Sequence, residues 1–156
     1  MEEIYRQYRK WLLTLAYRLT GNWDLAADAV HDVFAKLLSS EDCLKDVNSV
    51  KNWLAKSVCN RALDHKRLAW YRLRGLLEDW DSWNVLSQHS YEEKDLIARI
   101  LKKLTARERA VLVLRDMEGY PVSEIAQILN INENTVRVLS KTGRDKFIRL
   151  YENEDQ

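Results

Sequence analysis

Turn-forming residues are scarce in this chain of 156 residues, which contains four glycines and one proline. A β-sandwich or β-barrel needs many tight turns, so the composition excludes these all-β folds. No apolar run approaches the roughly 18 residues that a membrane-spanning helix requires. The two cysteines, Cys43 and Cys59, match no common metal-binding or redox spacing, so we expect free thiols in a reducing cytoplasm. Residues that favour helices are abundant, and the expected fold class is all-α.

The formal net charge is only +1, but the charges are unevenly distributed. Residues 51–74 carry seven basic residues against one acid, and residues 137–149 carry five against one. Residues 75–99, between them, carry six acids against two basic residues. The two basic segments are therefore candidate surfaces for nucleic-acid phosphates, although each could also be a solvated helix face.

Apolar periodicity predicts two small helical domains joined by a flexible linker. In the first half it predicts helices over about 3–20, 23–38 and 50–73. In the second half, the pairs Ser90/Glu93 and Thr105/Glu108 are capping boxes that begin further helices. Periodicity fails between the halves, in an acidic segment that includes Trp80 and Trp83. The expected division is a domain over 1–74, a linker over 75–89 and a domain over 90–156, with limited contact between the domains.

Residues 120–144 have the pattern of a helix-turn-helix. A short apolar helix is followed by the tight turn 130–132, where Asn132 can cap a longer, basic helix. Gly143 of that helix would permit close approach to a neighbouring helix. Arg137, Lys141 and Arg144 would lie on its outward side, within reach of guanine edges or phosphates. The alternative is an ordinary helical hairpin with a solvated basic face.

Three segments together resemble the extracytoplasmic-function (ECF) sigma factors, bacterial subunits that lead RNA polymerase to promoters. LTGNWDLAADAVHDVFAKLL and WLAKSVCNRALDHKR resemble the family's polymerase-binding helix and the helix that reads the −10 promoter element. LTARERAVLVLRDMEGYPVSEIAQILNINENTVRV resembles the domain that reads the −35 element. The resemblance covers almost the whole chain, and the occurrence of these motifs in this order is highly specific.

The resemblance implies three binding surfaces. The surface for the clamp of the largest polymerase subunit would consist of Asp24, Asp28, His31 and Asp32, with His31 where the family usually has Gln. The −10 surface would consist of Asn52, Lys56, Asn60, Arg61, Asp64 and Arg67, with the loop at 42–52 capturing a flipped base. For Trp53, beside it, plain core packing is the favoured interpretation. The −35 surface would consist of Arg115, Arg137, Val138, Lys141, Thr142 and Arg144. Val138 and Leu139 replace the family's frequent Ser and Arg, so the −35 sequence cannot be transferred from a relative.

The function we expect is that of a sigma factor, with core RNA polymerase, promoter DNA and an anti-sigma factor as partners. We expect no enzyme activity, no cofactor, no metal site and no small-molecule substrate, because no catalytic residue pairing or phosphate-binding loop emerges. One alternative is a helix-turn-helix regulator that binds DNA without polymerase, and another is a protein-interaction module that occupies polymerase. The first half discriminates, because a simple repressor needs neither the acidic face around Asp28 nor the stripe from Lys56 to Arg67.

Overall fold

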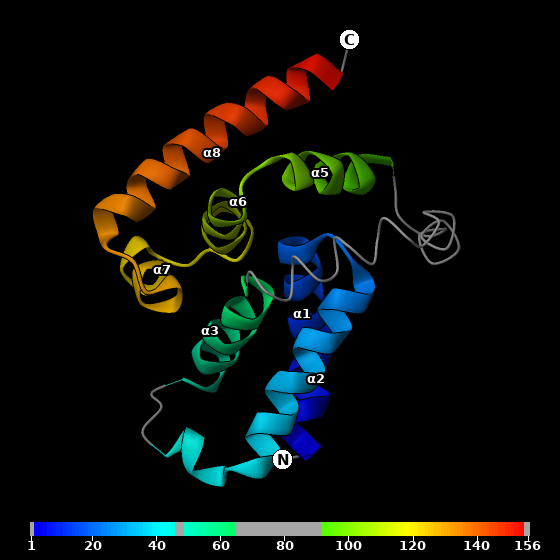
Figure 1. Ribbon diagram of the computed structural model, residues 1–156, viewed down its shortest axis with the longest axis vertical. Helices are drawn as coiled ribbons and strands as arrows, with labels where there is room; N and C mark the ends of the chain where they lie inside the picture. The colour runs from blue at the N-terminus through cyan, green and yellow to red at the C-terminus, as the bar shows by residue number, and fades with distance from the viewer. Residues whose placement is uncertain (1, 46–48, 65–91, 155–156) are drawn as a thin grey trace.

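The computed structural model describes residues 2–45, 49–64 and 92–154, and every regular element in these ranges is a helix (Figure 1). The first half consists of α1 (Glu2–Thr20), α2 (Trp23–Ser39), the short 3₁₀ helix η1 (Glu41–Leu44) and α3 (Val50–Ala62). The second consists of α5 (Glu92–Lys103), α6 (Ala106–Leu112), the π-helical turn η3 (Val113–Met117), α7 (Val122–Leu129) and α8 (Glu133–Glu154). The expected all-α class is confirmed. Within the described ranges, none of the helices is long and apolar enough to cross a membrane. The expected linker, with Trp80 and Trp83, lies outside the described residues.

Local sequence signals set most of the helix boundaries. Gly21 has a φ of 68°, in the left-handed region that glycine tolerates, and separates α1 from α2. The side chain of Asn22 then caps α2 by accepting hydrogen bonds from the backbone N–H groups of Asp24 and Leu25. Gly119, with a φ of 76°, lies between η3 and α7. These boundaries lie where the glycine and asparagine positions predict them.

The prediction that α3 continues to residue 73 is wrong, because the helix ends at Ala62. Leu63 leaves the helical region with φ −94° and ψ 5°, and the Asp64 N–H bonds to the Arg61 carbonyl only three residues back, at 3.4 Å. No glycine or proline marks this end, so the sequence gives no stop signal. Residues 65–73 lie outside the described part.

The two halves share a single hydrophobic core, so the prediction of limited contact between them is also wrong. Buried residues of α1 and α3, such as Leu15 and Val58, belong to the same cluster as Val111 and Ile125 of the second half. Helix α3 packs against α7, and α1 packs against α5, α6 and η3. Small domains bury a limited fraction of their apolar surface when they fold alone, so joint packing increases what each half buries. Figure 1 shows α6 and α7 lying between the three helices of the first half and α8.

Candidate functional site

The helix-turn-helix is formed by α7 and α8. Asn130 ends α7 in the left-handed conformation, with φ 54° and ψ 48°. The N–H of Ile131 then donates to the Ala126 carbonyl at 3.0 Å, which satisfies an end group of α7. Asn132 begins α8, because its side-chain oxygen accepts from the Thr135 N–H at 2.7 Å. The predicted turn and cap are confirmed, and they fix the direction in which α8 leaves the turn.

Helix α8 separates a buried face from an outward face. Its buried residues are Val136, Ser140 and Gly143. The predicted −35 residues on this helix are all exposed, namely Arg137, Val138, Lys141, Thr142 and Arg144. They are thus available to a partner, as expected, and packing of the core does not use them.

Two arginines of this surface have partners on another helix, and a third, Arg137, pairs with Glu133 of its own helix at 3.5 Å. The half-buried Arg115 donates to the Ser140 hydroxyl at 3.0 Å, so it braces the inner side of α8. Arg144 forms an ion pair with Asp116 of η3 through two hydrogen bonds. These bonds, and then the charge of the carboxylate, raise the pKa of Arg144 further above its already high value. Both arginines therefore tie the outer helix to η3, and DNA contact by either one stays a prediction.

Glu108, buried behind α8, holds that helix in place. Its carboxylate accepts from Lys146 at 2.9 Å and from the Thr105 hydroxyl at 2.8 Å, and the Glu108 N–H donates to Thr105, as the predicted cap requires. Burial opposes ionisation, but the hydrogen bonds from Lys146 and Thr105 and the Lys146 charge outweigh it and lower the pKa of Glu108. A Cβ placed on Gly143 would lie 3.5 Å from the Glu108 carbonyl oxygen, an ordinary contact. Close helix approach therefore does not require glycine at 143.

The predicted −10 residues of α3 are divided by the early end of that helix. Lys56, Asn60 and Arg61 are exposed on α3, and Asn52 is half-buried in its first turn. Asp64 is exposed but lies beyond the end of the helix, so it does not continue the Lys56–Asn60 stripe as predicted. Arg67 lies outside the described residues.

The aromatic and sulfur groups of α3 face the core. Trp53 is half-buried and packs against the core, with the Lys36 ammonium 6.0 Å from its ring centroid, which supports the core-packing interpretation. Cys59 is fully buried, and burial, followed by the charge of Glu118, raises the pKa of its thiol to about 12. The thiol is therefore protonated at neutral pH. In the described ranges, no three Cys, His, Asp or Glu side chains gather as a metal site would require.

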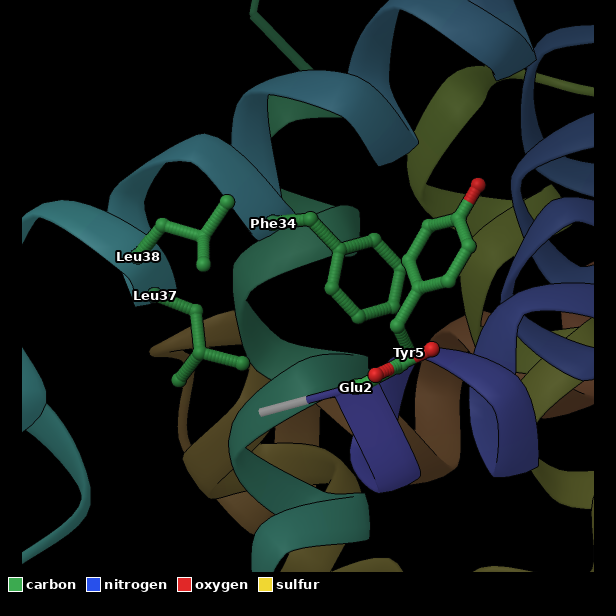
Figure 2. A pocket seen from close by; sticks show the side chains of 5 residues that line it. All are labelled: Glu2, Tyr5, Phe34, Leu37 and Leu38. Atoms are coloured by element: carbon green, nitrogen blue, oxygen red, sulfur yellow. The ribbon is translucent and has the colours of Figure 1, made fainter.

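The acidic residues of α2 form one surface, which we call the acidic face. Asp24 and His31 are exposed, and Asp28 and Asp32 are half-buried. Helical spacing places Leu38 two turns after His31 on the same side, and its side chain is 68% exposed. Leu38 borders a pocket of about 350 Å³ between α1 and α2, lined also by Glu2, Tyr5, Phe34 and Leu37 (Figure 2). The acidic face thus ends in an apolar pocket.

Polar contacts between the halves were missed by sequence reasoning. The Trp11 indole N–H and the Arg18 guanidinium of α1 donate to the two oxygens of Glu118, at 2.8 and 3.2 Å. Arg109 donates to the Leu19 carbonyl at 2.7 Å and to the Leu101 carbonyl at 2.7 Å, near the C-terminal ends of α1 and α5. The partners that join the two halves are 90 to 107 residues apart, so no local pattern could have revealed them.

Two family models match the chain. Residues 4–71 match the model described as sigma-70 region 2, and residues 94–146 match the model described as sigma-70, region 4. The first match covers α1 to α3, and the second covers the helix-turn-helix.

Curated relatives and a solved structure agree with these matches. The RNA polymerase sigma factor SigV of Bacillus subtilis is 30% identical over 126 residues, which cover 79% of this chain and 74% of SigV. The "Probable ECF RNA polymerase sigma factor SigI" of Mycobacterium tuberculosis is 28% identical over 155 residues, covering 92% of this chain. The chain spans about half the length of SigI, 52%. A structure of the sigma factor RpoE in complex with the anti-sigma factor NepR, from Bartonella quintana, has the same fold, with a TM-score of 0.71, 18% identity and coverage of 97% of this chain and 98% of RpoE.

Proposed function

Because the chain belongs to the ECF group of RNA polymerase sigma factors, we propose that it binds core RNA polymerase and directs transcription initiation at specific promoters. In this proposal α3 contributes to reading the −10 element, and α8 reads the −35 element. In this proposal the chemistry of RNA synthesis belongs to the polymerase, and the chain directs it to the promoter. It acts where the polymerase is, in the cytoplasm.

The observation that carries the proposal is the outward face of α8. Its residues are exposed, and three of them, Arg137, Lys141 and Arg144, are long basic side chains outside the core. The helix is held from behind by Arg115 and Glu108. A braced helix of this width fits the major groove of B-DNA. Basic side chains beside it can reach phosphates as well as base edges.

The acidic face of α2 is the proposed polymerase-binding surface. Carboxylates at Asp24, Asp28 and Asp32 suit a basic partner, and the pocket beside Leu38 offers the same partner an apolar contact. This surface favours a sigma factor over a regulator that acts without polymerase, since a simple repressor would have no use for it.

An anti-sigma factor is the third proposed partner. The similar RpoE structure contains such a protein, NepR, which supports an equivalent partner for this chain. The domain division proposed from the sequence is a separate point. It places the residues proposed to read the −10 element in a domain over 1–74 and those proposed to read the −35 element in a domain over 90–156.

Charge reversal at Asp28 tests the function directly. Because Asp28 lies in the middle of the acidic face, the Asp28→Arg variant should lose binding to core polymerase by at least tenfold, since a like-charge contact at an interface costs several kcal/mol. Affinity is measured by titrating labelled protein with core enzyme. Asp145→Arg, an exposed reversal on α8, is the matched control and should bind normally. Equal affinity for the Asp28→Arg variant and the wild type would remove this face from the interface.

A further inference from the structure

An apolar side chain interrupts the polar outward face of α8. Val138 is 60% exposed and lies in the second turn of the helix, on the side opposite the buried residue Val136. A β-branched residue at such a position does not pack in the core, and it favours the helix less than lysine or glutamate would. Val138 is therefore available to a partner on the side of α8 that is proposed to face DNA.

The neighbours of Val138 define what it can contact. Arg137, adjacent in sequence, and Lys141, three residues further along, are both exposed and basic. One turn after Val138, the Thr142 hydroxyl donates to the Val138 carbonyl at 3.1 Å, so its hydrogen is used within the helix. The surface around Val138 therefore combines aliphatic groups with flanking positive charge.

In the major groove of duplex DNA, only the C5-methyl of thymine among the four standard bases offers an apolar contact. We propose that Val138 is a specificity-determining residue that packs on this methyl group and selects thymine at one position of the −35 element. The flanking cations bind phosphates or base edges and hold Val138 against the base. This inference rests on the proposed promoter recognition and adds the base that the helix selects.

The first experiment finds the position. Holoenzyme reconstituted from core polymerase and the full chain is used to select from promoters with a randomised −35 region. We expect the selected motif to contain an invariant thymine. Replacing it by uracil removes only the methyl group and should weaken binding about fourfold, the factor that corresponds to the burial of one methyl group. A promoter with cytosine at this position should also bind weakly. Replacing that cytosine by 5-methylcytosine restores the methyl group and should recover part of the affinity.

The second experiment assigns the contact to Val138. The Val138→Ala holoenzyme, which lacks the two γ-methyl groups of valine, should discriminate thymine from uracil less than the wild type does. Ile148→Ala is the matched control, since Ile148 is also an exposed apolar residue of α8, 54% exposed and ten residues further along, about 15 Å away. This control should keep the fourfold preference.

The outcomes separate this inference from the proposed function. A selected motif without thymine, or one in which no thymine responds to uracil, would overturn the role of Val138 while promoter recognition stands. A Val138→Ala variant that keeps the full fourfold preference for thymine would also overturn this role, and weaker binding to core polymerase would then make Val138 a protein contact instead. Wild-type holoenzyme that selects no motif at all would refute both proposals.

Discussion

At the scale of single residues, Glu108 shows how a buried charge can position a functional helix. It is 4% exposed, yet it accepts hydrogen bonds from the start of α6 and from Lys146 on α8. One of its oxygens, Oε2, is buried without a hydrogen-bond partner in the described structure. Replacing the Glu108 carboxylate by a neutral group of the same shape should therefore lower the free energy of unfolding, because Lys146 would lose the negative charge with which it pairs.

The lowered pKa of Glu108 predicts a pH dependence of stability. A carboxyl with a lowered folded-state pKa stabilises the fold fully above its ordinary value, roughly 4.3, and this contribution is lost as the pH falls through the folded-state pKa. At pH 7, Glu108→Gln should lower the free energy of unfolding by about 1–3 kcal/mol. The difference from wild type should shrink as the pH falls toward 3. Urea denaturation at several pH values measures it, with the exposed Glu152→Gln as control. A difference that is constant with pH would show that the charge of Glu108 is not its source.

At the scale of elements, the backbone shows which positions require glycine. Gly21 and Gly119 have positive φ and require it, whereas Gly143 does not. Gly143 lies inside α8, where alanine favours the helix by about 0.5–1 kcal/mol and its Cβ has room. Gly143→Ala should therefore raise the free energy of unfolding by this amount. Gly21→Ala should lower it by more than about 1 kcal/mol, since φ is +68° and the new Cβ would lie 2.6 Å from Cε of Lys102.

The Gly119→Ala variant separates the two causes of destabilisation at Gly21, which are the positive φ and the clash with Lys102. The φ of Gly119 is +76°, but nothing lies within 4 Å of the added Cβ, so only backbone strain remains. The free energy of unfolding of Gly119→Ala should lie between those of Gly143→Ala and Gly21→Ala. Thermal or urea unfolding of all three variants measures this order. A Gly143→Ala variant less stable than wild type would mean that α8 and α6 must approach more closely than the 3.5 Å contact indicates.

Elements that local signals define could be predicted from the sequence, and those fixed by distant partners could not. The caps at Asn22 and Asn132 and the exposed face of α8 follow from residue type and helical spacing. The end of α3 has no breaker, and its final turn simply tightens at Asp64. In the candidate site, exposure of Arg137 and Lys141 was predictable, whereas the bond from Arg115 to Ser140 was not, since it joins residues 25 apart on different helices.

At the scale of the whole molecule, the shared core conflicts with the proposal that α3 and α8 read two promoter elements at the same time. The −10 and −35 elements are separated by roughly 25 base pairs, or about 85 Å at 3.4 Å per base pair. A compact chain of this length has a radius of gyration of about 15 Å. The surfaces on α3 and α8 therefore cannot reach both elements while the halves stay packed together. We expect the halves to separate when the chain binds polymerase.

Contacts at Glu118 and Arg109 are polar contacts between the halves that must then break. Glu118 accepts from Trp11 and Arg18, and Arg109 donates to backbone carbonyls of both halves. Hydrogen bonds to charged groups contribute about 1.5–3 kcal/mol each, a substantial share of the stability of a small protein. The bonds of Glu118 both join the halves, whereas Arg109 bonds to one carbonyl of the first half, Leu19, and to three carbonyls near the end of α5. Removing these bonds should therefore weaken the association of the halves and also loosen the connection between α5 and α6.

The double variant Glu118→Ala/Arg109→Leu should therefore open the molecule. A protease site inserted between residues 75 and 89 lets the two halves be cut apart without denaturant. After cleavage, the halves of the wild type should co-elute in gel filtration because the apolar contacts and these bonds remain. Those of the double variant should elute separately, each still helical by circular dichroism.

Before cleavage, X-ray scattering should give the double variant a larger radius of gyration than the wild type. The double variant should also bind core polymerase faster, since separation of the halves precedes binding. Asp145→Ala, an exposed change on α8, is the control and should behave as wild type. If the double-variant halves still co-elute, the apolar contact of α3 with α7 is sufficient to hold the molecule closed, and the polymerase must break that contact instead.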